Sequence, residues 1–206
     1  MVELDFARWA VPAVGVLLVT GLVVLASQDW RWIIAALGVQ YAAVFVLVAG
    51  SWRLELAVVK LVAGWMATAI LGASQDMTQI DPERAHPSGS VFRVLVGAMV
   101  GLTVFSLVPD VMALLAPYMD SVPWPELAGG LLLMGMGLAL LGLNARPLRV
   151  ILALLVLFSG FEVLYAVVED STLVAGLLAL VNLALAMMGA YLHLVARLEL
   201  PEEKRP

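Results

Sequence analysis

Long apolar runs separated by short polar segments dominate the chain. Seven such runs can be marked, each bounded by charge, proline or glycine, at 9–27, 33–50, 54–73, 91–115, 127–143, 148–168 and 172–195. A helix needs about 20 mostly apolar residues to cross a hydrocarbon core of roughly 30 Å. The runs lack the period-two alternation of barrel strands and are too long for them. The pattern therefore predicts an all-α, polytopic membrane protein with about seven transmembrane helices.

The seven runs suggest a single transmembrane domain spanning residues 1–206, with one irregular helix near its middle. Pro109 and Asp110 interrupt the fourth run, so one interpretation ends its helix near Val108 and adds a short interfacial helix. The segments 9–73 and 127–195 share a layout of three runs with a short Arg-bearing turn. This shared layout suggests a pair of parallel three-helix repeats, joined by the helix 91–115.

The basic residues predict how the chain is oriented. Lys and Arg are enriched in cytoplasmic loops. With seven spans, one side of the membrane holds only Arg8 and Arg53, whereas the other side holds Arg31, Arg84, Arg93, Arg146, Arg149, Arg197, Lys204 and Arg205. We therefore expect the N-terminus outside, the C-terminus in the cytoplasm, and a multi-pass protein of the cell's inner, cytoplasmic membrane.

Composition then excludes several classes of function. The chain is 63% hydrophobic and 13% charged, and it has no cysteine, so thiolate metal sites and disulfides are excluded. Its two histidines, His86 and His193, make a haem or zinc site unexpected. Phosphate-binding loops, zinc-protease motifs and nucleophile elbows are absent, and no basic face for nucleic acid is present. We expect neither an enzyme nor a cofactor, and no metal site.

Two charged residues lie inside the apolar runs at matching depth. Lys60 follows the start of the third run by six residues, and Glu162 precedes the end of the sixth run by six residues. The third run begins, and the sixth run ends, at the outer side of the membrane. Each of the two residues therefore lies about 9 Å below the outer boundary at 1.5 Å per residue. A charge at the centre of a membrane helix costs about 2.5 kcal/mol or more. A pair is geometrically allowed if the two spans are neighbours or are bridged by water.

The two charges have more than one interpretation. They can be a proton relay, because burial penalises the charged form of each group and favours proton exchange. They can also be a structural ion pair, a Lys60 that reaches outward to the interface, or a protonated Glu162 bonded to a backbone carbonyl. Four uncharged polar residues within the spans could extend a proton path or simply join helices: Gln40, Asn182, Ser159 and Tyr165.

These residues, in order, resemble one family of membrane subunits. Gln40, Lys60, the following "GASQDMTQIDPE", then Arg146 and Arg149 before the sixth run, and Glu162 within it, carry the resemblance. The chain resembles component E of energy-converting, formate-hydrogenlyase-type NiFe hydrogenases. Its last three spans resemble the K subunit of respiratory complex I and the C subunit of Mrp antiporters. Asn182 departs from the K-subunit pattern, which has membrane acids in two successive helices.

The resemblance implies a partner role within a larger complex. Antiporter-like and other membrane subunits would be its neighbours, and protons or Na⁺ would be the transported ions. Glu162 would be the relay carboxylate, Lys60 a relay or charge-setting lysine, and Arg146 and Arg149 would line the cytoplasmic loop. We therefore expect a non-catalytic subunit of a complex-I-like or Mrp-like ion-translocating complex. A stand-alone small transporter and a membrane anchor or assembly subunit without transport are the alternatives.

Overall fold

The protein is a bundle of long helices. A computed structural model describes residues 6–75, 87–119, 123–169 and 171–198, and these residues form seven α-helices without strands. All seven are long and apolar enough to cross a membrane, which confirms the predicted class of fold. The helices are α1 (Phe6–Ala26), α2 (Trp30–Ser51), α3 (Leu54–Ser74), α4 (Pro87–Leu115), α5 (Trp124–Leu143), α6 (Pro147–Val168) and α7 (Thr172–Leu198).

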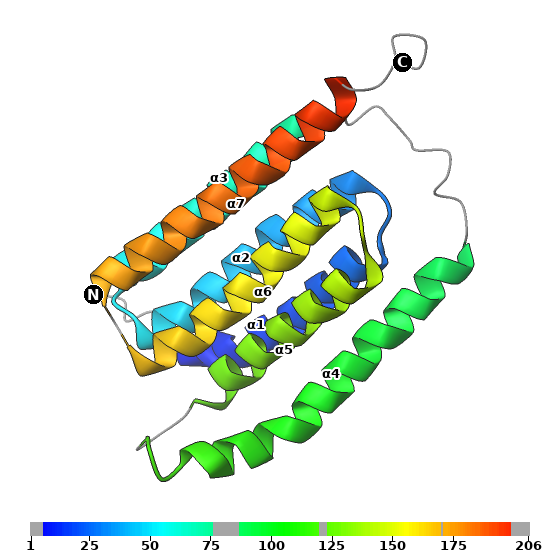
Figure 1. Cartoon of the computed structure of the whole chain (residues 1–206). Coiled ribbons are helices and arrows are strands. Elements are labelled where there is room, and N and C mark those ends of the chain that lie inside the picture. The colour runs from blue at the N-terminus through cyan, green and yellow to red at the C-terminus, as the bar shows by residue number, and fades with distance from the viewer. Residues whose placement is uncertain (1–5, 76–86, 120–122, 170, 199–206) are drawn as a thin grey trace.

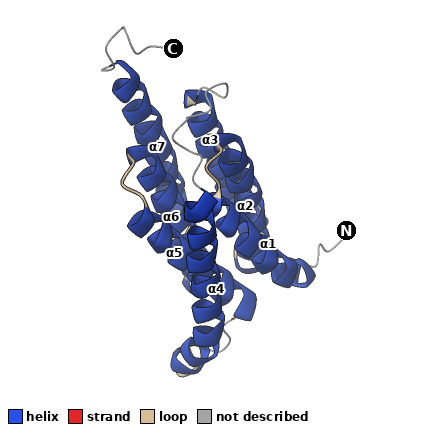
Figure 2. Ribbon diagram, turned by 90° about the vertical axis from the view of Figure 1, so that its right-hand side faces the viewer, coloured by secondary structure: helices blue, strands red, loops and turns tan. Residues whose placement is uncertain are grey.

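Six of the helices form two stacked layers. One layer contains α1, α2 and α3, and the other contains α5, α6 and α7 (Figure 2). Across the layers α1 packs on α5, α2 on α6 and α3 on α7 (Figure 1). Each candidate repeat thus occupies one layer, and an ancestral duplication remains a prediction. The fourth helix lies at one edge, where it packs against α1 and α5.

The interpretation that ends the fourth helix near Val108 is wrong. The helix continues through Pro109 and Asp110 to Leu115. A proline removes one backbone donor and often bends a helix, but membrane helices tolerate it. Figure 1 shows α4 curving along its length at the edge of the bundle. Pro109 and Asp110 are both exposed, so neither disturbs the packed face of α4.

Local sequence sets several helix ends. The Asp29 carboxylate accepts a hydrogen bond of 3.0 Å from the backbone N–H of Arg31 and caps the start of α2. Proline occupies the first turn of α5 and of α6, where its fixed φ suits a helix start and its missing N–H costs nothing. These signals help to fix where α2, α5 and α6 begin.

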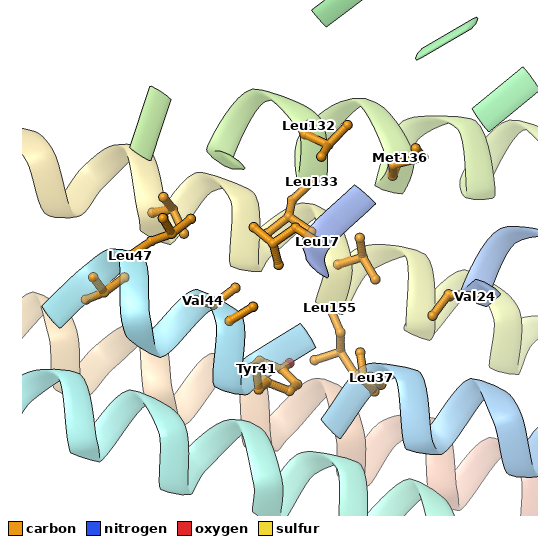
Figure 3. Packing of buried hydrophobic residues seen from close by; sticks show 14 of the residues in the cluster. Leu17, Val24, Leu37, Tyr41, Val44, Leu47, Leu132, Leu133, Met136 and Leu155 are labelled. Carbon is orange, nitrogen blue, oxygen red and sulfur yellow. The ribbon is translucent and has the colours of Figure 1, made fainter. Parts of the chain in front are cut away.

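The core lies between the two layers. Leu17, Leu37, Leu47, Leu133 and Leu155 are fully buried there and come from α1, α2, α5 and α6 (Figure 3). Many outward-facing side chains are also apolar, as expected of helices whose outer surfaces contact lipid rather than water.

Glycines bring α5 and α6 unusually close together. A Cβ added to Gly160 would lie 2.6 Å from the Gly130 carbonyl oxygen, and one added to Gly137 would lie 2.7 Å from the Leu157 nitrogen. Only glycine permits this backbone approach. The contact fixes the position of α6, which carries Glu162.

Candidate functional site

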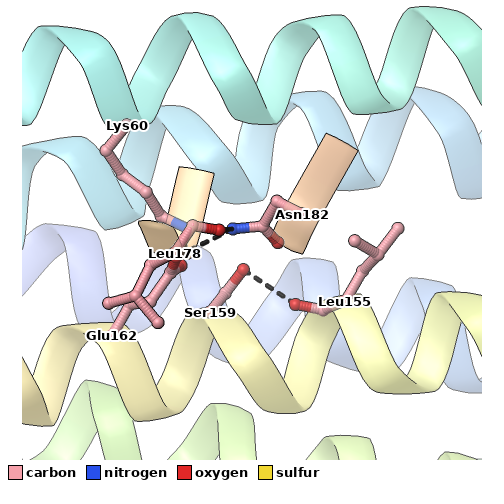
Figure 4. Close-up of polar contacts among 6 residues, drawn as sticks. All are labelled: Lys60, Leu155, Ser159, Glu162, Leu178 and Asn182. Carbon is pink, nitrogen blue, oxygen red and sulfur yellow. Dashed lines mark hydrogen bonds and ion pairs between the residues drawn. The ribbon is translucent and has the colours of Figure 1, made fainter. Parts of the chain in front are cut away.

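Lys60 and Glu162 form an ion pair inside the bundle. The Lys60 ammonium on α3 meets Glu162 Oε2 on α6 (Figure 4), and the side chains are 4% and 1% exposed. The helices α3 and α6 do not pack against each other directly. Instead, α3 packs on α2 and α7. The pair is therefore diagonal across the two layers. The long, flexible lysine side chain makes this reach possible.

Asn182 completes the surroundings of the carboxylate. Its Nδ2 donates to Glu162 Oε1 over 2.8 Å, and the side chain is fully buried on α7. Both carboxylate oxygens are thus engaged, one by an ammonium and one by an amide (Figure 4). This is the interhelical hydrogen bond that a polar residue in a membrane helix commonly makes. The Asn182 carbonyl oxygen is buried and has no hydrogen-bond partner in the described part of the chain.

Tyr41 on α2 packs against the lysine side of the pair. The Lys60 Nζ lies 5.2 Å from the centroid of the Tyr41 ring, within the range of a cation–π contact. Gly64, one turn after Lys60, makes room for the ring, since a Cβ there would overlap it. The Tyr41 side chain is 1% exposed. The cluster of Tyr41, Lys60, Glu162 and Asn182, hereafter the central polar cluster, therefore draws on α2, α3, α6 and α7.

Neither Tyr41 nor Gly64 is among the site residues that the sequence predicts. Two signals were present: Tyr41 follows the mid-span Gln40, and Gly64 lies four residues after Lys60, on the same helix face. Glu126 was also missed. It lies in the first turn of α5, is 6% exposed, and approaches Gly50 at the end of α2. Its position at the boundary of a run resembled that of a solvated residue.

The contacts found for the other candidate path residues lie outside the Lys60–Glu162 ion pair. Ser159 is fully buried one turn before Glu162, and its hydroxyl donates to the Leu155 carbonyl over 2.9 Å (Figure 4). Gln40 is 1% exposed, and its side-chain oxygen has no hydrogen-bond partner among the described residues. Tyr165 stacks on Phe161 with ring centroids 6.1 Å apart. Of the four uncharged residues proposed for a polar path, Asn182 is the one seen to contact the ion pair.

Arg146 and Arg149 lie at the other end of α6. Arg146 precedes the first turn, and Arg149 Nη2 donates to the Ser27 carbonyl over 3.2 Å. Thirteen residues separate Arg149 from Glu162, or about 20 Å along the helix. Arg149 therefore ties the start of α6 to the turn between α1 and α2, and neither arginine is brought to the central polar cluster.

Within the described residues, no group of three His, Cys, Asp or Glu side chains could hold a metal ion. Comparison with family models, curated proteins and solved structures finds no match for this chain. Its fold and central polar cluster define a class, a multi-pass helical membrane protein with a buried ion pair.

Proposed function

We propose that this chain is a non-catalytic membrane subunit of an ion-translocating complex, and that Lys60 and Glu162 are its charge-handling pair. The carrying observation is the burial of two opposite charges at 4% and 1% exposure, joined across helices that do not otherwise touch. A buried ion pair is a poor source of stability, since apolar residues of similar size often serve as well or better. Its presence therefore favours a role in charge movement.

The geometry suggests one chemical step. Transfer of a proton from Lys60 Nζ to Glu162 Oε2 would convert the ion pair into a neutral amine and a neutral acid without changing the net charge. A proton or Na⁺ arriving in a neighbouring subunit would shift that balance through its electric field. Asn182 can hold the carboxyl group in either state, because its N–H also hydrogen-bonds the carbonyl oxygen of a protonated acid. Antiporter-like membrane subunits are the proposed neighbours, consistent with the resemblance of the sequence.

A structural lock is the second candidate, and it would suit an anchor or assembly subunit. Both oxygens of Glu162 are engaged, and the pair joins α3 to α6 across the bundle. A fixed cross-link would have the same contacts as a relay at rest. The two roles differ in whether the charges must change during turnover.

The first test identifies the partners. A tag on the C-terminus, purification in mild detergent and mass spectrometry of the retained proteins should recover antiporter-like subunits with a redox module. Elution of the chain alone or as a homo-oligomer would reject the complex-subunit proposal and leave transport by the isolated protein in liposomes as the question.

The second test separates relay from lock. Glu162→Gln keeps the shape of the side chain and an oxygen for Asn182, but it cannot ionise. We expect the assembled complex to lose proton pumping while retaining its partners. Glu126→Gln is the matched control, because it removes another buried membrane carboxylate outside the central polar cluster. Normal pumping by a fully assembled Glu162→Gln complex contradicts the relay role, whereas failure of this variant to assemble favours the lock.

A further inference from the structure

A polar cavity lies at the end of the bundle opposite to the ion pair. It has a volume of about 560 Å³, and side chains of α2, α4, α6 and α7 line it together with the turn between α5 and α6. Three arginines contribute to the wall: Arg93, Arg146 and Arg149. We call this the arginine cavity. Ligand pockets commonly have volumes of this size.

Four side chains in the wall of the arginine cavity are hydrogen-bond donors only: Trp30, Arg93, Arg146 and Arg149. Guanidinium groups and the indole of Trp30 can donate but not accept. The Trp30 Nε1 and an Arg93 Nη atom are buried and have no hydrogen-bond partner among the described residues. The first turn of α6 also lines the cavity and has no side-chain cap, so its backbone N–H groups add a positive helix end. Such a wall suits an anion with several acceptor oxygens, as in a phosphate group.

An apolar groove begins close to the arginine cavity and runs deeper into the membrane region. It has a volume of about 330 Å³ between α4 and α5, and it is lined by Val96, Met99, Val100, Thr103, Val104 and Gly135. Arg93, Val96 and Val100 recur at spacings of three and four residues, so they form one stripe of α4. Leu143 at the cavity and Gly135 in the groove likewise lie on α5.

The groove is long enough for much of one acyl chain. Its lining on α4 runs from Val96 to Val104, over which the helix advances about 12 Å, somewhat less than half of a hydrocarbon core of roughly 30 Å. The fourth helix is at the edge of the bundle, and Met99 is 68% exposed, so membrane lipid can reach the groove from the side.

From this juxtaposition we infer that the arginine cavity binds the phosphate of an anionic phospholipid, with an acyl chain in the groove between α4 and α5. A free phosphate shares the headgroup chemistry but has no apolar part that could occupy the groove. Basic pockets between membrane helices are suited to anionic lipid headgroups. The inference does not depend on the proposed ion transport.

The test is a lipid titration of the delipidated full-length chain in a neutral detergent. Phosphatidylglycerol is added, and thermal stability is measured as a function of lipid concentration. The Arg93→Gln variant should need about tenfold more lipid for half of the effect, since one charge-assisted hydrogen bond is lost. Trp30→Phe removes one donor while keeping an aromatic ring, and it should weaken binding in the same direction. Arg31→Gln is the control, an exposed arginine of the same end that does not line the cavity.

Each outcome decides the matter. Weaker binding in Arg93→Gln and Trp30→Phe, with Arg31→Gln like the wild type, supports the lipid site. Equal lipid dependence in all four proteins overturns it, because general surface charge would then explain the effect. Inorganic phosphate is titrated in parallel. If it stabilises the protein as much as phosphatidylglycerol does, the cavity takes a free anion and the lipid inference fails. If Arg93→Gln does not fold, Trp30→Phe and the phosphate arm still decide.

Discussion

At the scale of single residues, Lys60 and Glu162 can be buried because each neutralises the other. Removing one partner leaves an uncompensated charge, which costs about 3–5 kcal/mol in a buried pair unless the remaining group becomes neutral. Removing both charges avoids that cost. The two substitutions should therefore be strongly non-additive, as expected for residues in direct contact.

This non-additivity is the first prediction. Lys60→Met should lower the thermal stability of the purified protein more than the double substitution Lys60→Met with Glu162→Gln does. The measurement is thermal unfolding in detergent for the wild type, both single variants and the double variant. Losses that simply add would contradict a direct energetic coupling. In the relay proposal, the double variant assembles but does not pump protons, whereas in the structural-lock alternative it does both.

Asn182 permits a second prediction, on pH. Asn182→Asp would put a second carboxyl group within hydrogen-bond distance of Glu162, where the amide now lies at 2.8 Å. Two carboxylates beside one ammonium cannot both ionise without repulsion, so the variant must hold an extra proton. Its stability should be greatest at low pH, below the ordinary pKa of a carboxyl group, and should fall as the pH rises and removes that proton.

The control for this prediction is Asn182→Leu. It loses the hydrogen bond to Glu162 but adds no ionisable group, so its stability should be lower than that of the wild type without a new dependence on pH. An Asn182→Asp variant whose thermal unfolding tracks the wild type at every pH would show that the two side chains do not face each other.

At the scale of helices, the close contact of α5 and α6 positions Glu162, which lies two residues after Gly160. A Cβ at Gly160 would collide with backbone atoms of α5, including the Gly130 carbonyl oxygen at 2.6 Å. Backbone cannot rotate away as a side-chain tip can. The helices would have to separate, and α6 would carry the carboxylate away from Lys60.

The third prediction follows from this contact. Gly160→Ala should destabilise the protein by about 1–3 kcal/mol, the usual cost of overpacking, and should also weaken the Lys60–Glu162 coupling measured by the double variant. Gly142→Ala is the matched control on α5, where an added Cβ meets nothing within 4 Å. Thermal unfolding of both variants checks the prediction, and equal behaviour of the two would contradict the close approach.

Helices and depth could be predicted from the sequence, but helix neighbours could not. Hydropathy located all seven spans, since each must satisfy its own backbone hydrogen bonds in lipid. Counting residues placed Lys60 and Glu162 at one depth. Their direct contact needs α2 and α7 to lie between α3 and α6 at a set spacing, and that spacing depends on packing at glycines such as Gly64 and Gly189. Apolar periodicity does not encode such contacts, because nearly every face of these helices is apolar.

At the scale of the whole molecule, the two edges of the bundle differ, because α4 covers only one of them. The fourth helix packs on α1 and α5, and among the described residues no comparable helix covers the α3–α7 edge. The central polar cluster draws on that same edge through Lys60 and Asn182. A neighbouring subunit that senses the charge of the pair would therefore act most strongly from the α3–α7 side, where α3 and α7 have exposed apolar residues such as Val58, Val62 and Leu180.

The orientation of this molecule in the membrane is the last prediction, and the absence of cysteine makes it easy to measure. Ala145→Cys places a thiol in the exposed turn between α5 and α6, and Tyr118→Cys places one after α4, at a residue that is 83% exposed. These positions lie at opposite ends of the bundle, because one helix separates them. The excess of Lys and Arg at the end with Ala145 predicts that this end faces the cytoplasm. A membrane-impermeant maleimide should therefore label Tyr118→Cys in intact cells, and Ala145→Cys only after permeabilisation. The cysteine-free wild type controls for background, and the reverse labelling pattern would invert the orientation of the ion pair and the arginine cavity.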